Sequence, residues 1–321
     1  AMATEAETHM RNAITAQNLL VASLEVQGSL VKTVIMNGRY LRDAEAVART
    51  ARVLSAAAPP EIENFEITLM RAGQALTTVT LPRTQLDALA RRTGSTAELF
   101  LSSRLEPGSN EKLEHLNANL FPRAGYELYP IFRQSFFDPD NPVYVEFGAG
   151  ASGFVELARG LFVEGSVKIG FYDNFGDIKR GSNSVLPHVR SDIREYLQHG
   201  QYGFETLTAS YFFKLHPEIY GRVAAGYVER MFAGIGTELL YRPYGERWAL
   251  GFDFWAVQQR DFDILFALRP YQAFTGHISA YYAAPWYNLL FKVSAGQYLA
   301  GDRGVTFELS RRFASGITVG A

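Results

Sequence analysis

The residues from about Pro142 to the end of the chain alternate between apolar and polar side chains. Stretches of about ten such residues are separated by short turns. Successive side chains of a β-strand point to opposite faces of a sheet, so each stretch predicts a strand with one apolar and one polar face. In one stretch the apolar face carries Leu161, Val163, Val167, Ile169 and Phe171, and the polar face carries Phe162, Glu164, Ser166, Lys168 and Tyr172.

The composition of the two faces separates two classes of β-protein. A soluble β-sandwich turns long charged side chains towards water, and its strands are usually shorter. Here the polar face is rich in Gly, Ser and Thr with few charges, and the apolar face is rich in aromatic residues. That combination predicts an antiparallel up-and-down transmembrane β-barrel, with about ten strands in this chain. We expect strands at 143–156, 161–172, 187–197, 205–214, 219–229, 232–242, 247–258, 273–283, 287–297 and 304–313.

Residues 1–105 follow a different pattern, which predicts a small α+β module with the element order ββαββα. Its helices show apolar residues at helical spacing and end near Pro or polar residues, and its strands alternate. A polar linker at 106–125 would join this module to the barrel segment at 126–321, which opens with a turn cluster at 137–142. Within the module we expect strands at 20–26, 31–36, 62–70 and 75–81 and helices from Asp43 to Pro59 and from Thr84 to Arg92.

The overall composition changes this picture little, but it excludes several classes of protein and of functional site. The 321 residues are enough for two domains, and 13% aromatic residues with 28 Gly suit an outer-membrane barrel. The mean hydropathy is -0.07, and no stretch approaches the roughly 18 apolar residues that a membrane-spanning helix needs. A net charge of -2 offers no basic patch for nucleic acid. The absence of Cys excludes disulfides and thiolate sites.

Both ends of the sequence suggest a piece of a longer protein. The chain begins with Ala1, and no basic and apolar signal segment follows it. It ends within an expected strand at 318–321, whereas a closed barrel leaves no strand edge unpaired. We therefore expect the segment to be truncated at both ends.

Charged residues on the polar face are the candidates for lining a barrel lumen. Charges of both signs can pair across neighbouring strands and fill the lumen, or they can bind a hydrated sugar chain by hydrogen bonds. The lumen candidates are Glu146, Glu164, Lys168, Arg190, Asp192, Arg194, Arg222, Glu238, Asp253, Lys292, Glu308 and Arg312. Aromatic residues near strand ends are candidates for an interfacial girdle or for ordinary core. These are Trp248, Trp286, Tyr241, Tyr244, Tyr282 and Tyr287.

Little else in the sequence predicts chemistry. The stretch 173–177 resembles part of a cation loop but lacks further acidic ligands, so we interpret it as a turn and predict no metal and no cofactor. His188 and His277 lie in expected strands, and neither is spaced to pair with another ligand or with a nucleophilic Ser. An acid–base pair of Asp192 and Glu195 would place its two side chains on opposite faces of one strand. We predict no catalytic residue.

Several stretches of the second region carry a resemblance to known proteins, namely 135–142, 171–175, 186–193, 220–222, 226–234, 238–243, 259–263, 275–277 and 298–304. They strongly resemble the YjbH family, outer-membrane proteins associated with exopolysaccharide secretion. The resemblance covers residues 126–321, and the small module resembles the one that precedes these strands in the family. It implies further barrel strands on both sides and an N-terminal export signal.

The sequence and the resemblance together predict an outer-membrane barrel that takes part in exopolysaccharide secretion as a conduit or accessory. The partners implied are outer-membrane lipid, polysaccharide and periplasmic polysaccharide-export proteins, with the small module in the periplasm. Two rivals remain: a barrel enzyme that modifies glycan or lipid, and a plugged structural or adhesive barrel. Lumen width depends on strand number and tilt, so the sequence does not separate a conduit from a plugged barrel.

Overall fold

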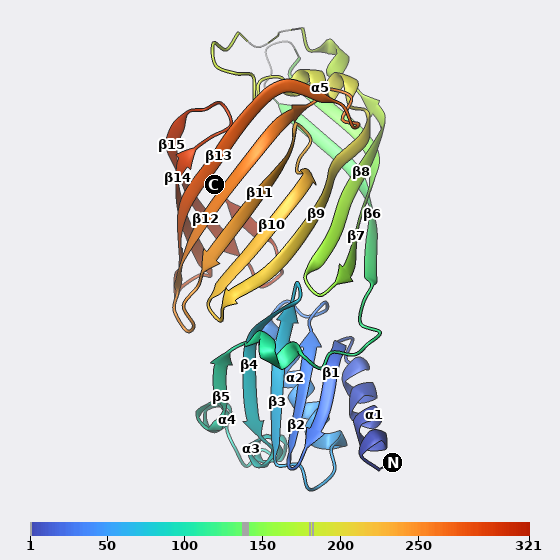
Figure 1. The fold of residues 1–321 in the computed structure, drawn as a ribbon, viewed down its shortest axis with the longest axis vertical. Coiled ribbons are helices and arrows are strands. Elements are labelled where there is room, and N and C mark those ends of the chain that lie inside the picture. The colour runs from blue at the N-terminus through green and yellow to red at the C-terminus, as the bar shows by residue number, and fades with distance from the viewer. Residues whose placement is uncertain (1, 137–140, 180, 182) are drawn as a thin grey trace. The chain divides into compact units, whose positions relative to one another are not determined.

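The computed structural model describes residues 2–136, 141–179, 181 and 183–321. The chain divides into two compact units (Figure 1). Unit 1 consists of Ala1–Phe121 with Lys214–Glu218, and unit 2 consists of Pro122–Phe213 with Ile219–Ala321.

Unit 1 is an α+β fold built on a five-stranded sheet with the strand order β1-β2-β3-β4-β5. β2 and β3 run parallel, and the other neighbours are antiparallel. The parallel pair requires a crossover, which α2 supplies. The elements are α1 (Met2–Thr15), β1 (Leu20–Gln27), β2 (Leu30–Met36), α2 (Asp43–Ala57), β3 (Asn64–Arg71), β4 (Gln74–Pro82), α3 (Arg83–Ala90), α4 (Thr96–Ser102), β5 (Arg104–Pro107) and the 3-10 helix η1 (Asn110–Leu113).

Both faces of this sheet are covered. On one face α1 and α2 pack against the strands, and Met10, Leu54 and Phe65 are completely buried there. On the other face Leu113 and Leu120 pack against Val34 and Met70. Unit 1 therefore removes most of its large apolar side chains from water within its own fold.

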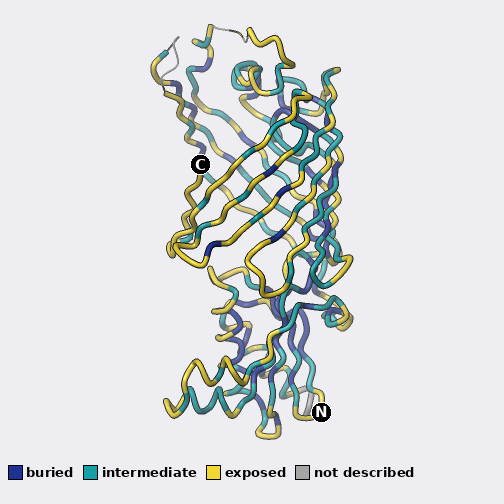
Figure 2. The backbone as a smooth tube through the Cα atoms, turned by 90° about the vertical axis from the view of Figure 1, so that its left-hand side faces the viewer, coloured by how far each residue is buried: buried dark blue, intermediate teal, exposed yellow. Residues whose placement is uncertain are grey.

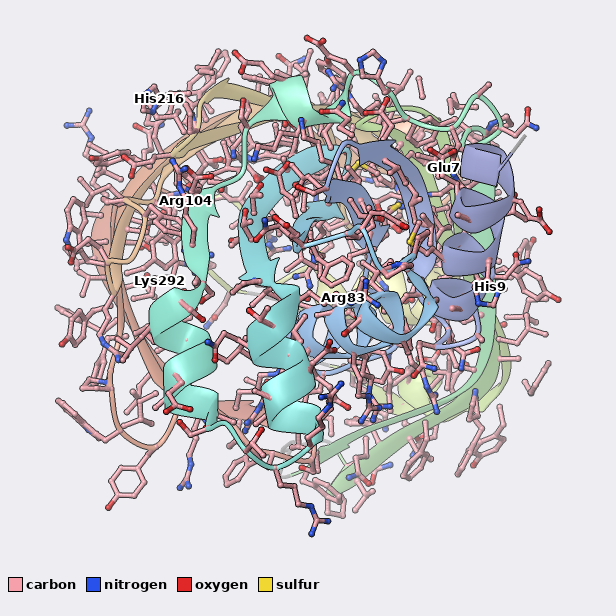
Figure 3. All side chains as sticks on the ribbon, turned by 90° about the horizontal axis from the view of Figure 1, so that it is seen from below. Glu7, His9, Arg83, Arg104, His216 and Lys292 are labelled. Carbon is pink, nitrogen blue, oxygen red and sulfur yellow. The ribbon has the colours of Figure 1, made fainter. Side chains whose placement is uncertain are left out.

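Arg83 fixes the C-terminal end of α2. Its guanidinium donates hydrogen bonds to the carbonyl oxygens of Ser55 and Ala58 at 2.9 and 3.1 Å and to those of Pro59 and Ile62 at 2.5 and 3.2 Å. Figure 3 shows Arg83 beside this helix. The carbonyls at a helix C-terminus lack intrahelical partners, so one side chain satisfies several of them together.

The structure contains more of unit 1 than the sequence pattern predicted. The predicted ββαββα elements are present as β1, β2, α2, β3, β4 and α3, and α1, α4 and β5 are additional. Residues 106–121 of the predicted linker fold with unit 1 and not as a separate linker. Asn117 donates to the carbonyl oxygen of Val21 at 2.8 Å, and the Asn110 amide donates to Gln74 at 2.8 Å.

Unit 2 is one antiparallel sheet of 11 strands in which every strand pairs with its neighbours in the chain. Figure 1 shows these strands side by side in a strongly curved sheet. Among the described residues, β6 and β16 each pair with a single strand, so the sheet has two edges. The strands are β6 (Arg123–Phe136), β7 (Val143–Ala158), β8 (Leu161–Asp173), β9 (Tyr202–His216), β10 (Ile219–Tyr227), β11 (Phe232–Tyr241), β12 (Trp248–Arg260), β13 (Leu268–Ala283), β14 (Leu289–Gln297), β15 (Arg303–Arg312) and β16 (Thr318–Gly320).

This architecture confirms an α+β module followed by an antiparallel, mostly β region. Nine of the ten strands predicted between 143 and 313 are present, β16 is the strand expected at 318–321, and β6 is additional. The predicted strand 187–197 is wrong: this stretch holds turns and the helix α5 (Ile193–His199), in which Tyr196 is completely buried. Of the turn cluster predicted at 137–142, residues 137–140 lie outside the described residues. No helix in the described part of the chain has the length and apolarity needed to span a membrane.

The sheet of unit 2 has two faces of opposite character. We define the polar face as the side that carries Glu146, Lys168 and Asp253, and the apolar face as the opposite side. On the apolar face Ile169, Ile278 and Phe307 are 56%, 67% and 74% exposed. Figure 2 shows exposed positions recurring along these strands. The exposed apolar side chains on this face include Val163, Val167, Ile169, Leu250, Phe252, Phe291, Val293, Val305 and Phe307.

Candidate functional site

A buried ion cluster joins four strands on the polar face. Glu146 of β7 accepts from Lys168 of β8 at 2.5 Å and from Arg133 of β6 at 3.0 Å. Arg133 also donates to Glu205 of β9 at 2.5 Å, and Arg230 forms an ion pair with the same carboxylate. The side chains of Glu146 and Lys168 are 3% and 1% exposed. Mutual compensation is what permits charges to be buried at this depth.

A second row of charges crosses the polar face from β8 to β13. Arg222 lies 3.8 Å from Glu164 and 3.4 Å from Glu238. Glu238 stands directly opposite Asp253 in the β11–β12 register. Like charges at such positions repel each other unless each has a partner of its own. The partner of Asp253 is His277, whose Nδ1 lies 2.9 Å from the carboxylate.

The remaining lumen candidates separate into two groups. Lys292 and Glu308 form an ion pair at 2.8 Å between β14 and β15, and Arg312 is exposed at the end of β15. Arg190, Asp192 and Arg194 do not line a strand, because the strand predicted for them is absent. Instead, Arg190 pairs with Glu229 at 2.7 Å, and Asp192 faces His188 at 3.0 Å.

The polar face is hollowed over β6–β10 and β12. The cavity has a volume of about 820 Å³, and its lining includes Tyr129, Phe154, Trp255, Ser166, Thr206 and Arg222. Of the described residues that line it, Arg222 is the one cation and Glu127 and Glu164 are the carboxylates. The Ser166 and Thr206 hydroxyls are hydrogen bonded to each other at 2.9 Å, and Ser152 donates to Glu127 at 2.8 Å.

Three of the four aromatic residues that line this hollow have rings that lie against a glycine on the neighbouring strand. Tyr129 pairs with Gly150, Phe154 with Gly125 and Trp255 with Gly236 in the strand register. A Cβ atom at Gly236 would lie 2.1 Å from the Trp255 ring, and one at Gly150 would lie 2.4 Å from the Tyr129 ring. Glycine at these positions therefore lets the rings lie close to the sheet.

Helix α5, the β10–β11 connection (228–231) and the β12–β13 connection (261–267) cover one end of the polar face. Tyr196, Ile264 and Phe232 belong to one buried apolar cluster there. The Tyr196 hydroxyl donates to the carbonyl oxygen of Arg260 at 2.5 Å, and burial raises the pKa of this phenol to about 12. The completely buried Arg260 guanidinium donates to the carbonyl oxygens of Glu229 and Ile264 at 2.9 and 2.6 Å. We call this assembly the cap.

The six predicted girdle residues gather where β11 ends, where β12 begins and where β13 ends. The Tyr241 and Trp248 rings meet edge to face at 5.8 Å between centroids, and Trp248 pairs with Tyr282 in the register. All six side chains are exposed, so at these positions ordinary core is the poorer interpretation.

The stretch 173–177 ends β8 and continues into the short 3-10 helix η2 (Phe175–Asp177), where the sequence predicted a turn. The Asp173 carboxylate accepts from the Phe175 amide at 3.1 Å, and the Asn174 side chain bonds both ways with β7. In the portion of the chain that the structure describes, no group of three or more His, Asp or Glu side chains is arranged to hold a metal ion.

Sequence reasoning missed several residues that organise the polar face. Arg133 and Glu205 were not among the lumen candidates, because β6 was not predicted and Glu205 lies at the first residue of a predicted strand. The alternation in 123–136 contains the signal for β6, although Pro130 weakens it. Arg260 was not singled out either, since its partners are carbonyl oxygens of loops that no sequence pattern brings together.

Comparison with known proteins places this sheet in a defined family. A family model described as "Exopolysaccharide biosynthesis protein YbjH", named YjbH, matches residues 2–321. The chain is 33% identical over 293 residues to a protein of Escherichia coli (strain K12) described as "Uncharacterized lipoprotein YjbH". The match covers 88% of this chain and 41% of that relative, so the chain spans less than half of the relative's length. The resemblance predicted for residues 126–321 is confirmed, and it extends through unit 1.

Proposed function

The chain belongs to the YjbH family, which is described by exopolysaccharide biosynthesis, and from this premise we propose that unit 2 is part of an outer-membrane β-barrel that takes part in exopolysaccharide secretion. One observation carries the proposal. The sheet exposes aromatic and aliphatic side chains along one face and pairs its charges on the other. An exposed apolar surface of this extent marks a surface that meets lipid or another protein.

Strand dimensions support a membrane location. β6 to β15 contain between 9 and 16 residues each, and about 9–11 residues of a tilted strand cross a bilayer. The exposed aromatic residues near the ends of β11 to β13 would lie at one membrane interface. The curated relative is described as a lipoprotein, which agrees with an envelope location for this chain.

Unit 1 would lie in the periplasm and contact the rest of the export machinery. Its sheet is covered on both faces by its own helices and by residues 110–121, as expected of a module that folds in water.

A role of unit 2 in transport would require no chemical reaction on the polymer. The polar face would offer a hydrated path along which a polymer makes many weak contacts.

A secretion assay in cells tests this role. We expect that Glu127→Gln or Glu164→Gln in the full-length protein lowers secreted polymer at most severalfold, because passage depends on many weak contacts. If either carboxylate were a catalytic acid or base, its loss would lower the output by about 10²–10⁴-fold. Secreted polymer is compared at matched abundance in the outer membrane, with Glu246→Gln in the exposed β11–β12 turn as the control. A loss of that size, or altered chain length of the polymer, would favour the enzyme instead.

A plugged scaffold is the second candidate, and the cap favours it. α5 and the β12–β13 connection pack on the polar face at one strand end, where Phe232 and Val257 are buried beneath them. A conduit would require the cap to move. Single-channel conductance of the full-length protein in a lipid bilayer separates the two: steady ion current is expected of a conduit, and none of a plugged barrel.

A further inference from the structure

We infer that the hollow on the polar face binds an uncharged stretch of glycan and discriminates against polyanionic polymers. This inference deepens the proposed role in secretion and rests on it. It concerns the substrate class, which neither the family description nor the relative's name states. The observations that carry it are the charge balance of the hollow and the placement of its aromatic rings.

Of the described residues that line the hollow, Arg222 is the one cation, and its guanidinium already has partners. Arg222 lies between Glu164 at 3.8 Å and Glu238 at 3.4 Å, and its guanidinium donates to the Ser210 hydroxyl at 3.0 Å. Its planar group also lies 5.6 Å from the Phe212 ring. A carboxylate or phosphate on a polymer would have to displace two protein carboxylates in order to reach it.

The surplus charge of the hollow is negative. Glu127 accepts from the neutral Ser152 hydroxyl, and among the described residues no Arg or Lys forms an ion pair with it. The Arg123 guanidinium, 5.4 Å from the Phe154 ring, is paired with Glu156. Outside the lining, the ion cluster holds Arg133, Lys168 and Arg230 against two carboxylates, those of Glu146 and Glu205. An anionic sugar in contact with the lining itself would therefore meet like charge without an unpaired cation among the described lining residues.

The uncharged part of the lining suits a sugar ring. Tyr129 and Trp255 lie against Gly150 and Gly236, so their positions are set by the backbone of the neighbouring strand. Rings held in this way can pack against the apolar C–H face of a pyranose, while hydroxyl groups such as those of Thr206 and Thr208 bond its edge. The volume of about 820 Å³ lies within the range of ligand-binding clefts.

The test uses the full chain in detergent and two linear α-1,4-linked probes of equal length, maltoheptaose and heptagalacturonate. The chain contains three Trp, so Trp248→Phe with Trp286→Phe leaves Trp255 as the one fluorescent reporter in the hollow. We expect maltoheptaose to change the Trp255 emission and to bind at least about tenfold more tightly than heptagalacturonate at low salt. Equal or tighter binding of heptagalacturonate overturns the inference and leaves the role in secretion intact. Binding of neither probe at millimolar concentration also overturns the inference, while the secretion assay judges the proposed function independently.

Two variants separate specific contacts from general disturbance of the fold. Tyr129→Ala should weaken maltoheptaose binding by about tenfold, since a ring contact contributes on the order of one factor of ten. Tyr211→Ala removes an exposed tyrosine of the apolar face and should leave binding unchanged. The double variant Glu164→Gln and Glu238→Gln releases Arg222 and should improve heptagalacturonate binding about tenfold or more. Unchanged Trp255 emission without sugar shows that this variant folds. If the folded variant does not bind heptagalacturonate more tightly than the parent chain does, then Arg222 does not set the charge preference.

Discussion

The sheets of the two units place large apolar side chains in different surroundings. In unit 1 Phe65 and Ile67 are completely buried, and helices and the segment 110–121 cover both faces. In unit 2 Phe307 and Phe274 are 74% and 61% exposed on one face, while Glu146 and Lys168 are almost inaccessible on the other. The same period-two pattern of apolar residues therefore produces a buried core in unit 1 and an exposed apolar face in unit 2.

This contrast shows where each unit obtains its stability. Unit 1 depends on apolar burial, which favours folding in water without any partner. Unit 2 depends on backbone pairing along 11 strands and on compensated charges across its polar face. Outside the buried cluster of the cap, the side chains of its apolar face contribute only where lipid or another protein covers them. Substitutions of one chemical kind should therefore act differently in the two units.

Truncating a phenylalanine in each unit should produce the largest difference. Phe65→Ala removes a completely buried ring and should lower the free energy of unfolding of unit 1 by about 3–5 kcal/mol. Phe307→Ala removes an exposed ring and should change the stability of unit 2 in detergent by less than about 0.5 kcal/mol. The denaturant dependence of amide exchange in β3 and β14 measures each effect. Equal losses would mean that Phe307 is buried in the folded protein.

Removing one carboxylate tests the charges of the polar face. Glu146→Gln leaves Lys168 buried with its nearest carboxylate gone, and we expect a loss of at least about 3 kcal/mol in the stability of unit 2. Glu308→Gln breaks an ion pair whose side chains are 30% and 50% exposed, and should cost less than about 1 kcal/mol. Both are measured by amide exchange in β7 and β14. A negligible effect at Glu146 would show that water reaches Lys168.

The strands were predictable because alternation is a local property. β8 and β12 were placed to within two residues, and the two faces were assigned correctly at Val163, Val167 and Lys292. The stretch 187–197 failed because Val189, Ile193 and Leu197 imitate an alternating pattern, whereas Tyr196 decides the conformation by packing against Ile264. Such a contact joins residues far apart in the chain, and periodicity does not report it.

The candidate site was predictable in part. Ion pairs between neighbouring strands, such as Lys292 with Glu308, follow from the register, and both residues were predicted to line the polar face. The hollow itself was not predicted, because it depends on curvature and on rings that lie over Gly150 and Gly236. Arg260 escaped notice because its hydrogen bonds are to backbone carbonyls, which carry no sequence signal.

The cap of unit 2 should respond to high pH. Burial raises the pKa of Tyr196 to about 12, so the stability that the protonated phenol provides is complete below its ordinary pKa of about 10 and is lost as the pH rises through 12. Tyr196→Phe should remove this pH dependence and cost about 1 kcal/mol through loss of the bond to Arg260. NMR of ¹³Cζ-labelled tyrosine follows the titration, with the exposed Tyr202 as the control. A Tyr196 midpoint at the ordinary tyrosine pKa of about 10 would contradict burial of the phenol.

A smaller pH effect is expected in the loop that precedes α5. The Ser184 carbonyl accepts from Nε2 of His188, and the Asp192 carboxylate accepts from Nδ1. The bond to Ser184, followed by the bond to Asp192, raises the pKa of His188. The protonated ring therefore favours this loop conformation at low pH, and the preference is lost as the pH rises through the pKa in the folded protein. Asp192→Asn should lower the midpoint that NMR measures for His188. An unchanged midpoint would mean that the two side chains do not meet in solution.

The most direct test of the contrast between the two sheets is the environment of the exposed face of unit 2. Because the chain contains no Cys, single cysteines at Ile169, Phe252 and Val293 can carry spin labels, with matched labels at Glu164, Asp253 and Lys292. Collision rates are measured with lipid-soluble oxygen and with a water-soluble nickel complex, using the full-length protein in lipid vesicles with any Cys outside this segment replaced by Ser. The account predicts that oxygen relaxes the first set and nickel the second. Nickel relaxing the first set would contradict a lipid-facing sheet and would leave a water-exposed apolar face that needs a protein partner.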